Sequence, residues 1–169
     1  MKYFVTSNLQ LGRPGAIKLY KRPYNSVEEM NADLISKWNS TVEPGDIVYH
    51  LGNFAWDPKT AQNSLLRLNG TIKIVLGEHE AAIRSLESKG MLRAGVSIVE
   101  CIQLEEDSVL SYWPLATWPN KAKKHFSVIG YPGKKFKSDP KTRVINVSTD
   151  LWNNIPQELD RIISIFKDI

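Results

Sequence analysis

Polar side chains follow two apolar, strand-like runs of the chain, at the point where each run ends. Asn53 comes directly after Gly52 at the end of the first run, and Glu78 and His79 follow Gly77 at the end of the second. Because neighbouring parallel strands of an open α/β sheet end at one edge, where ligands bind, we expect these three side chains to lie together. Carboxamide and imidazole N–H groups are hydrogen-bond donors for a phosphoryl oxygen.

The elements that position these residues are predicted from apolar periodicity and turn signals. The first half of the chain is expected to form strands over 2–5, 47–51 and 71–76 and helices over 26–38, 57–70 and 80–89. Ser26 and Glu29 form a capping box at the start of the first helix. His50, inside a strand, is expected to be a core residue rather than a ligand. Strands that alternate with helices indicate βαβ units with right-handed crossovers.

The second half of the chain no longer alternates strands with helices. Strands are predicted over 96–104, 109–115, 125–129 and 143–147, with a closing helix over 156–169. The acidic turn over 105–107 joins the first two strands, which indicates a β-hairpin and a more antiparallel half. Together the two halves predict an α/β fold with a two-sheet core flanked by helices.

Five segments at the predicted strand ends resemble the motifs of the calcineurin-like metallophosphoesterases, in the family's order. In the order of the chain they are TSNLQLG at 6–12 for D-x-H, VYHLGNFAW at 48–56 for GD, LNGTIKIVLGEHE at 68–80 for GNH[DE], LSYWPL at 110–115 for a lone His, and GYPG at 130–133 for G-H-x-H. Residues 146–156 resemble the last strand and its exit. The resemblance implies one domain over 1–169 with a four-layer α/β/β/α sandwich.

The positions at which this family holds its metals carry other side chains here. The replacements are Asn8 for Asp, Gln10 for His, Asn53 for the bridging Asp, Glu78 for Asn, and Tyr112, Tyr131 and Gly133 for His. His79, the family's general acid, is retained together with Glu80. Two divalent ions roughly 3.5–4 Å apart need anionic oxygen and imidazole ligands, which carboxamides and phenols do not replace. The resemblance with these departures predicts a pseudoenzyme with no catalytic residues, no metal and no cofactor.

The replacements leave polar groups that can hold a ligand directly. The predicted ligand-binding residues are Asn8, Gln10, Arg13, Asn53, Glu78, His79, Tyr112 and Tyr131. Their donors favour a nucleotide, a cyclic nucleotide signal or another phosphorylated small molecule. The carboxylate of Glu78 opposes a phosphate, so its predicted role is to orient His79 or to accept from a base or ribose hydroxyl. Small members of the family occur in bacteria and their viruses, where such a protein would sequester a nucleotide signal, as in viral counter-defence.

Three alternatives remain open at this point. One is a protein–protein interaction scaffold, for which the retromer subunit with this fold is a precedent, with an apolar patch around Trp113, Trp118 and Trp152. Another is residual phosphodiesterase activity with His79 as the acid and one weakly held metal. Nucleic-acid binding is the least favoured, because a net charge of +4 permits it but no recognised motif is present.

Composition places the chain among ordinary globular domains. Its 169 residues are 42% hydrophobic and 24% charged, which suits a single domain with a sizeable core. A single cysteine, Cys101, excludes an internal disulfide. No apolar run approaches the roughly 18–20 residues of a membrane span, and the N-terminus turns polar too early for a signal peptide. We therefore expect a cytoplasmic protein without membrane contact.

Two basic segments have open interpretations. The segment over 13–23 carries Arg13 and Arg22 and is expected to be an irregular loop, either solvated or a basic flap beside the strand ends. Between Lys121 and Arg143 there are eight Lys or Arg residues and one acid, Asp139. This second segment is either a solvated face or a positive rim around the ligand site that attracts phosphates.

Overall fold

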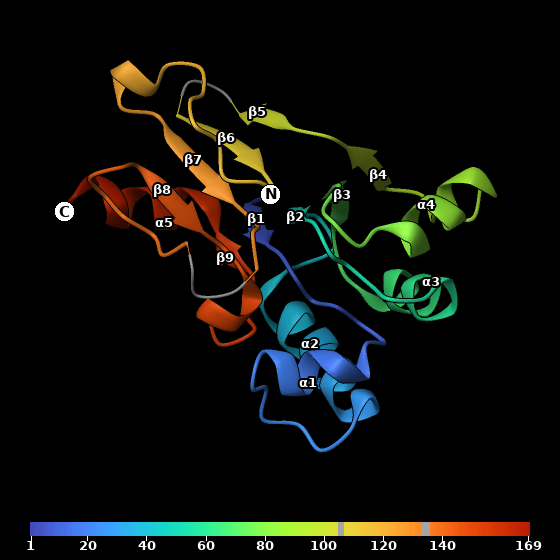
Figure 1. The fold of residues 1–169 in the computed structure, drawn as a ribbon. Helices are drawn as coiled ribbons and strands as arrows, with labels where there is room; N and C mark the ends of the chain where they lie inside the picture. Colours follow the sequence, from blue (N-terminus) through green and yellow to red (C-terminus); the bar gives the residue numbers. More distant parts are fainter. Residues whose placement is uncertain (105–106, 133–135) are drawn as a thin grey trace.

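The computed structural model describes residues 1–104, 107–132 and 136–169, which form a mixed α/β fold with two sheets (Figure 1). Glu105 and Glu106 of the predicted acidic turn, and Gly133 of the closing motif, lie outside the described residues. None of the helices in the described ranges is long and apolar enough to cross a bilayer.

The first sheet has the strand order β4-β3-β2-β1-β9. Its strands are β1 (Tyr3–Thr6), β2 (Ile47–Leu51), β3 (Thr71–Val75), β4 (Val96–Val99) and β9 (Gln157–Glu158). The pairs β1–β2, β2–β3 and β3–β4 are parallel, and β9 runs antiparallel to β1. The predicted βαβ units of the first half are confirmed.

Helices lie between these strands in the sequence. They are α1 (Pro14–Leu19), α2 (Val27–Thr41), α3 (Pro58–Arg67), α4 (Ala81–Ser88) and, after β9, α5 (Leu159–Lys167). The predicted caps are present: Ser26 Oγ accepts from the Glu29 N–H at the start of α2, and Asp57 accepts from the Thr60 N–H at the start of α3. The expected irregular loop over 13–23 is wrong in part, because α1 occupies it. Pro14 suits the first turn of a helix instead of breaking one.

The second sheet has the strand order β5-β6-β7-β8. Its strands are β5 (Ile102–Leu104), β6 (Ser108–Ser111), β7 (Phe126–Ile129) and β8 (Val144–Asn146), with 3₁₀ turns η1 (Lys121–Lys123) and η2 (Thr149–Leu151) beside them. Only β5–β6 is antiparallel, whereas β6–β7 and β7–β8 are parallel. The predicted antiparallel pairing of the two strands on either side of residues 105–107 is confirmed, and the second half is more antiparallel than the first, as predicted, because β9 also runs antiparallel to β1.

The predicted strand over 96–104 is two strands in different sheets. β4 pairs with β3 and β5 pairs with β6, so the chain crosses between the sheets at Glu100 and Cys101. No glycine or proline marks this crossing. Apolar residues on both sides of it made the segment look continuous.

Two cores follow from the pleat of the first sheet. Val48 points toward the helices, where it joins a cluster that includes Trp38 of α2, Leu65 of α3 and Ile83 of α4. Tyr49 and Leu51 point toward the second sheet and pack with Phe126, Val128 and Ile145. Leu159, Ile162 and Ile163 place α5 in this inter-sheet core. Figure 1 shows α1, α2 and α3 on one side of the first sheet and the second sheet on the other.

Candidate functional site

The carboxyl ends of strands from both sheets meet at one place. The Asn8 N–H donates to the Gly52 carbonyl at 3.0 Å, which joins the turns after β1 and β2. The His79 N–H after β3 donates to Asn53 Oδ1 at 2.9 Å, and Glu78 Oε2 lies 4.0 Å from His79 Nε2. The predicted meeting of Asn53, Glu78 and His79 is confirmed.

A network of carboxamides and one phenol forms the buried part of this site. Asn53 Nδ2 donates to Asn8 Oδ1 and to the Tyr112 hydroxyl, each at 3.0 Å. Asn8 Nδ2 donates to the Gly130 carbonyl at 2.5 Å and to Ser148 Oγ at 3.2 Å. All three of these predicted site residues are at most 2% exposed. Their polar atoms therefore bind one another and the backbone rather than facing solvent.

Two glycines allow the close packing that covers this hydrogen-bond network. A Cβ atom on Gly52 would lie 2.4 Å from the Tyr112 ring, and a Cβ on Gly130 would lie 1.9 Å from the Leu51 carbonyl oxygen. Glycine at these positions lets the Tyr112 ring cover the end of β2 and brings the second sheet against it. We call Asn8, Asn53 and Tyr112 the polar floor of the site.

The polar floor does not suit a pair of divalent metal ions. Its carboxamide oxygens already accept hydrogen bonds from Asn53 Nδ2 and the His79 N–H. Within the ranges that the structure describes, no three His, Cys, Asp or Glu residues are grouped so that they could hold a metal ion. A metal pair would need anionic oxygen and imidazole where the chain has amides and a phenol.

The Glu80 side chain links the segments that follow β2 and β3 through hydrogen bonds. Its Oε1 accepts from the backbone N–H groups of Asn53 and Gly77. Burial raises the pKa of Glu80 to about 7, although these hydrogen bonds oppose that shift. Its Oε2 is buried and has no hydrogen-bond partner among the described residues.

His50 is a core residue, as predicted. It is fully buried, lies edge-on to Phe54 with 5.1 Å between ring centroids, and has no described partner for either ring nitrogen. Burial lowers the pKa of His50 to about 3, so the ring is neutral.

Arg22 fixes the turn after β1. Its guanidinium donates to the carbonyls of Asn8 and Leu9 at 2.6 and 2.7 Å, and it forms two bonds with the carboxylate of Asp150 at 2.8 and 3.0 Å. The Arg22 side chain is only 1% exposed, so it is a structural residue and not part of a solvated basic flap. Sequence reasoning missed this role because Asp150 is 128 positions away.

A partly exposed group that includes two basic side chains, Arg13 and His79, lies beside the polar floor. The Arg13 guanidinium carbon is 4.3 Å from the centroid of the Trp56 ring, and the His79 ring lies edge-on to Trp56 at 5.4 Å. Gln10 is 2% exposed; its Nε2 donates to the Tyr20 hydroxyl at 2.9 Å, and its Oε1 accepts from Arg13 at 2.6 Å. We call Arg13, Trp56 and His79 the cationic corner. Trp56 was not among the predicted site residues.

An aromatic cluster contacts the floor at the Tyr112 ring. Trp113 and Tyr131 lie 4.8 and 5.9 Å from the Tyr112 ring, and Phe136 lies 5.3 Å from Tyr131. Trp113 is 50% and Phe136 43% exposed. Asn146 Nδ2 donates to the carbonyls of Tyr131 and Phe136, which holds this segment in place. We call Trp113, Tyr131 and Phe136 the aromatic cluster.

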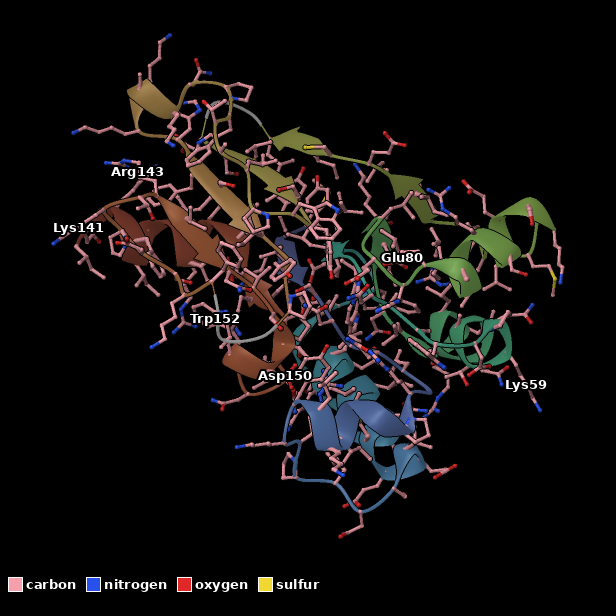
Figure 2. All side chains as sticks on the ribbon, in the orientation of Figure 1. Lys59, Glu80, Lys141, Arg143, Asp150 and Trp152 are labelled. Atoms are coloured by element: carbon pink, nitrogen blue, oxygen red, sulfur yellow. The ribbon has the colours of Figure 1, made fainter. Side chains whose placement is uncertain are left out.

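The basic segment lies largely away from this site. Lys121, Lys123 and Lys124 precede β7, and Lys141 and Arg143 precede β8. These are the amino ends of parallel strands, whereas the site lies at the carboxyl ends. Figure 2 shows Lys141 and Arg143 far from Glu80. Of the two interpretations left open for this segment, a solvated face therefore suits these five residues better than a positive rim around the site.

The predicted patch of three tryptophans is not formed either. Trp118 is 6% exposed, and its Nε1 donates to the His125 carbonyl at 2.9 Å near the amino end of β7. Trp152 is half-buried and donates to the Asn146 carbonyl. Of the three, only Trp113 is an exposed ring beside the candidate site.

Comparisons with known proteins establish the fold. No family model matches the sequence. The chain is 29% identical over 173 residues to an uncharacterized protein of Methanocaldococcus jannaschii, covering 98% of this chain and 92% of that protein. The crystal structure of a protein of unknown function from Aquifex aeolicus superposes with a TM-score of 0.72 at 17% identity, over 97% of this chain and 98% of the other. This likeness shows a shared α/β architecture.

Proposed function

We propose that the protein is a metallophosphoesterase-like pseudoenzyme that binds a phosphate-bearing small molecule, namely a nucleotide or cyclic nucleotide, without metal. One observation carries the proposal: a partly exposed cationic corner and a partly exposed aromatic cluster contact the same buried polar floor. Asn53 connects them, since it accepts from the His79 N–H and donates to the Tyr112 hydroxyl. The order of the five strand-end motifs supports the family assignment and its four-layer sandwich.

The cationic corner is the part suited to the phosphate. Arg13 offers a planar set of donors that matches a phosphate, and the Gln10 oxygen orients it. Because Gln10 gives its amide donor to Tyr20, its oxygen is left for Arg13. The His79 side chain is 41% exposed and adds a second nitrogen donor beside Trp56.

The aromatic cluster is the part suited to the base. Stacking of a base on an aromatic ring contributes about 1–3 kcal/mol and tolerates any base, because every base has a π-face. Trp113 and Phe136 offer exposed rings, with Tyr131 between them. Glu78 would accept a hydrogen bond from a ribose hydroxyl or an exocyclic amine, in keeping with its expected role.

This arrangement changes the roles expected for the buried residues. Asn8, Gln10, Asn53 and Tyr112 act in the proposal as a rigid support that holds Arg13, His79 and Trp113 in place. Direct contact with the ligand falls to Arg13, Glu78, His79, Tyr131 and the neighbouring rings. Such a site holds a nucleotide without supplying the charge that phosphoryl transfer requires, which suits sequestration rather than turnover.

Thermal unfolding in the presence of a chelator tests the proposal against a panel of mono-, di- and cyclic nucleotides. A ligand of the folded state stabilises it by about 2.7 kcal/mol at a hundredfold excess over its Kd. We expect one class of nucleotide to raise the unfolding temperature selectively. Arg13→Ala and His79→Ala are each expected to weaken the affinity for that nucleotide at least tenfold, whereas Lys59→Ala on α3 should leave the affinity unchanged. Equal affinities in all three variants would refute the assignment.

A protein partner is the second candidate, favoured by the exposed rings of Trp56, Trp113 and Phe136. Exposed apolar patches often mark interaction surfaces. This candidate predicts no stabilisation by any nucleotide and a defined complex that Trp113→Ala disrupts.

A further inference from the structure

The strand β4 forms one edge of the first sheet, and among the residues that the structure describes it pairs with β3 alone. The carbonyls of Gly95 and Val99 accept from the N–H groups of Ile72 and Leu76 at 2.8 and 3.1 Å. In this parallel register every second residue of the segment, beginning with Gly95, bonds to β3. The N–H and C=O groups of Ile98 therefore point away from the sheet.

The other sheet edges are shorter or covered. β9, at the opposite edge of the first sheet, has two residues, and β5, at one edge of the second sheet, has three. β8, at the remaining edge, is covered by the turn that precedes it, because Asp139 forms an antiparallel bridge with Val144 and Ser138 Oγ accepts from the Asn146 N–H. Short and covered edges protect a sheet from pairing with another chain. β4, with four residues, is the longest uncovered edge.

The sequence of this edge also lacks the residues that usually block pairing. Lysine and proline are the common guards on an exposed edge strand. Residues 94–99, which read AGVSIV, contain no charged residue and no proline. Ser97 is exposed, whereas Val96, Ile98 and Val99 are partly buried. Figure 1 shows β4 at the outer end of the first sheet. The edge thus combines free backbone groups with an uncharged strand.

We propose that the β4 edge is a dimerisation surface, at which a second copy of this chain adds its own β4 as an antiparallel strand. A two-fold axis at Ile98 places this residue opposite its copy, so that the two residues exchange both of their N–H···O bonds. The same register places Ser97 opposite Val99. It also places Glu100 opposite Val96, so no acid faces an acid across the interface. An identical chain therefore satisfies the outward groups without a like-charge contact.

Disulfide cross-linking tests this register. In a Cys101→Ser background, Ile98→Cys places two Cα atoms about 5.5 Å apart in the dimer, within the range of roughly 4.4–6.8 Å that a disulfide spans. Ser97→Cys is the matched control, because its copies lie diagonally, about 7–8 Å apart, although Ser97 is the more exposed residue. We expect Ile98→Cys to form a covalent dimer about tenfold faster or more. Equal rates, or faster cross-linking through Ser97→Cys, would overturn the proposal.

Sedimentation of the protein without nucleotide, over a range of concentrations, measures the affinity of the dimer. Ile98→Pro removes the N–H group that each copy donates, and proline is tolerated at an edge position whose N–H points outward. Loss of these two bonds is expected to weaken the dimer about 5–150-fold relative to Ile98→Ala, which keeps the N–H group. A wild-type protein that stays monomeric up to millimolar concentration, or equal affinities of the two variants, would overturn the proposal. A complex with a different protein that Ile98→Pro disrupts, while the purified chain stays monomeric, would overturn it as well.

Discussion

Glu80→Gln tests whether the buried carboxyl under Asn53 controls the stability of the site. Burial raises the pKa of Glu80 to about 7 from the ordinary glutamate value of 4.5. Between these two pH values the folded state binds more protons at this group than the unfolded state, so the free energy of unfolding falls as the pH rises. The full interval corresponds to about 3 kcal/mol.

Glutamine imitates the protonated carboxyl and removes this pH dependence. Its carbonyl oxygen can still accept from the N–H groups of Asn53 and Gly77, and it does not ionise. Relative to the variant, the wild type is therefore expected to lose about 3 kcal/mol of stability between pH 4.5 and pH 8. His50 has the opposite sign: its pKa is lowered to about 3, so it adds stability as the pH rises from about 3 to 6.5. That contribution is common to both proteins and cancels in the difference.

Urea unfolding followed by tryptophan fluorescence at several pH values between 4.5 and 8 measures this difference. Glu87→Gln, exposed on the same helix α4, is the matched control and should show no pH-dependent difference from the wild type. A wild-type minus Glu80→Gln difference that stays constant over this range would refute the assignment of a raised pKa to Glu80.

Two further predictions concern the residues that position the site. Arg22→Ala leaves the Asp150 carboxylate and two backbone carbonyls without their hydrogen-bond partner, and we expect it to lower the free energy of unfolding by about 3–5 kcal/mol. The control Arg84→Ala, at an exposed position, should lower it by less than about 0.5 kcal/mol. Equal losses in the two variants would contradict the buried ion pair. Gly130→Ala places a Cβ 1.9 Å from the Leu51 carbonyl and is expected to cost at least about 3 kcal/mol, whereas Gly15→Ala in α1 meets no atom within 4 Å and should be neutral or stabilising. Chemical denaturation of each pair decides the outcome.

Local signals in the sequence were sufficient for the first half of the fold. The capping side chains of Ser26 and Asp57 predict the starts of α2 and α3. The apolar run over 47–51 predicts β2 with its correct end. The glycine that follows each strand correctly indicated that Asn53 and His79 would meet. The caps join residues three positions apart, and the meeting of Asn53 with His79 follows from two consecutive parallel strands that end at the same edge of the sheet.

Features that depend on distant partners could not be predicted. The pairing of Arg22 with Asp150 and the placement of Tyr112 over Gly52 each join segments far apart in the sequence. Polar residue types also concealed burial: Asn8 and Gln10 were expected to face a ligand, yet they are at most 2% exposed because each finds partners within the fold. The basic segment brackets the Tyr131 motif in the sequence, which left open whether it lies beside the site or forms a solvated face. The parallel arrangement of β7 and β8 separates their two ends instead.

A titration of isotope-labelled wild-type protein with nucleotides in the presence of a chelator tests the central claim most directly. Two of the five tryptophans, Trp38 and Trp118, serve as internal references, because their indole N–H groups donate to the carbonyls of Asn69 and His125, which lie at the amino ends of β3 and β7. The account predicts saturable shifts of the indole resonances of Trp56 and Trp113 together with the amide of His79. Shifts confined to Lys121–Lys124 and to Lys141 and Arg143, or no shifts at all, would contradict a nucleotide site at the carboxyl ends of the strands.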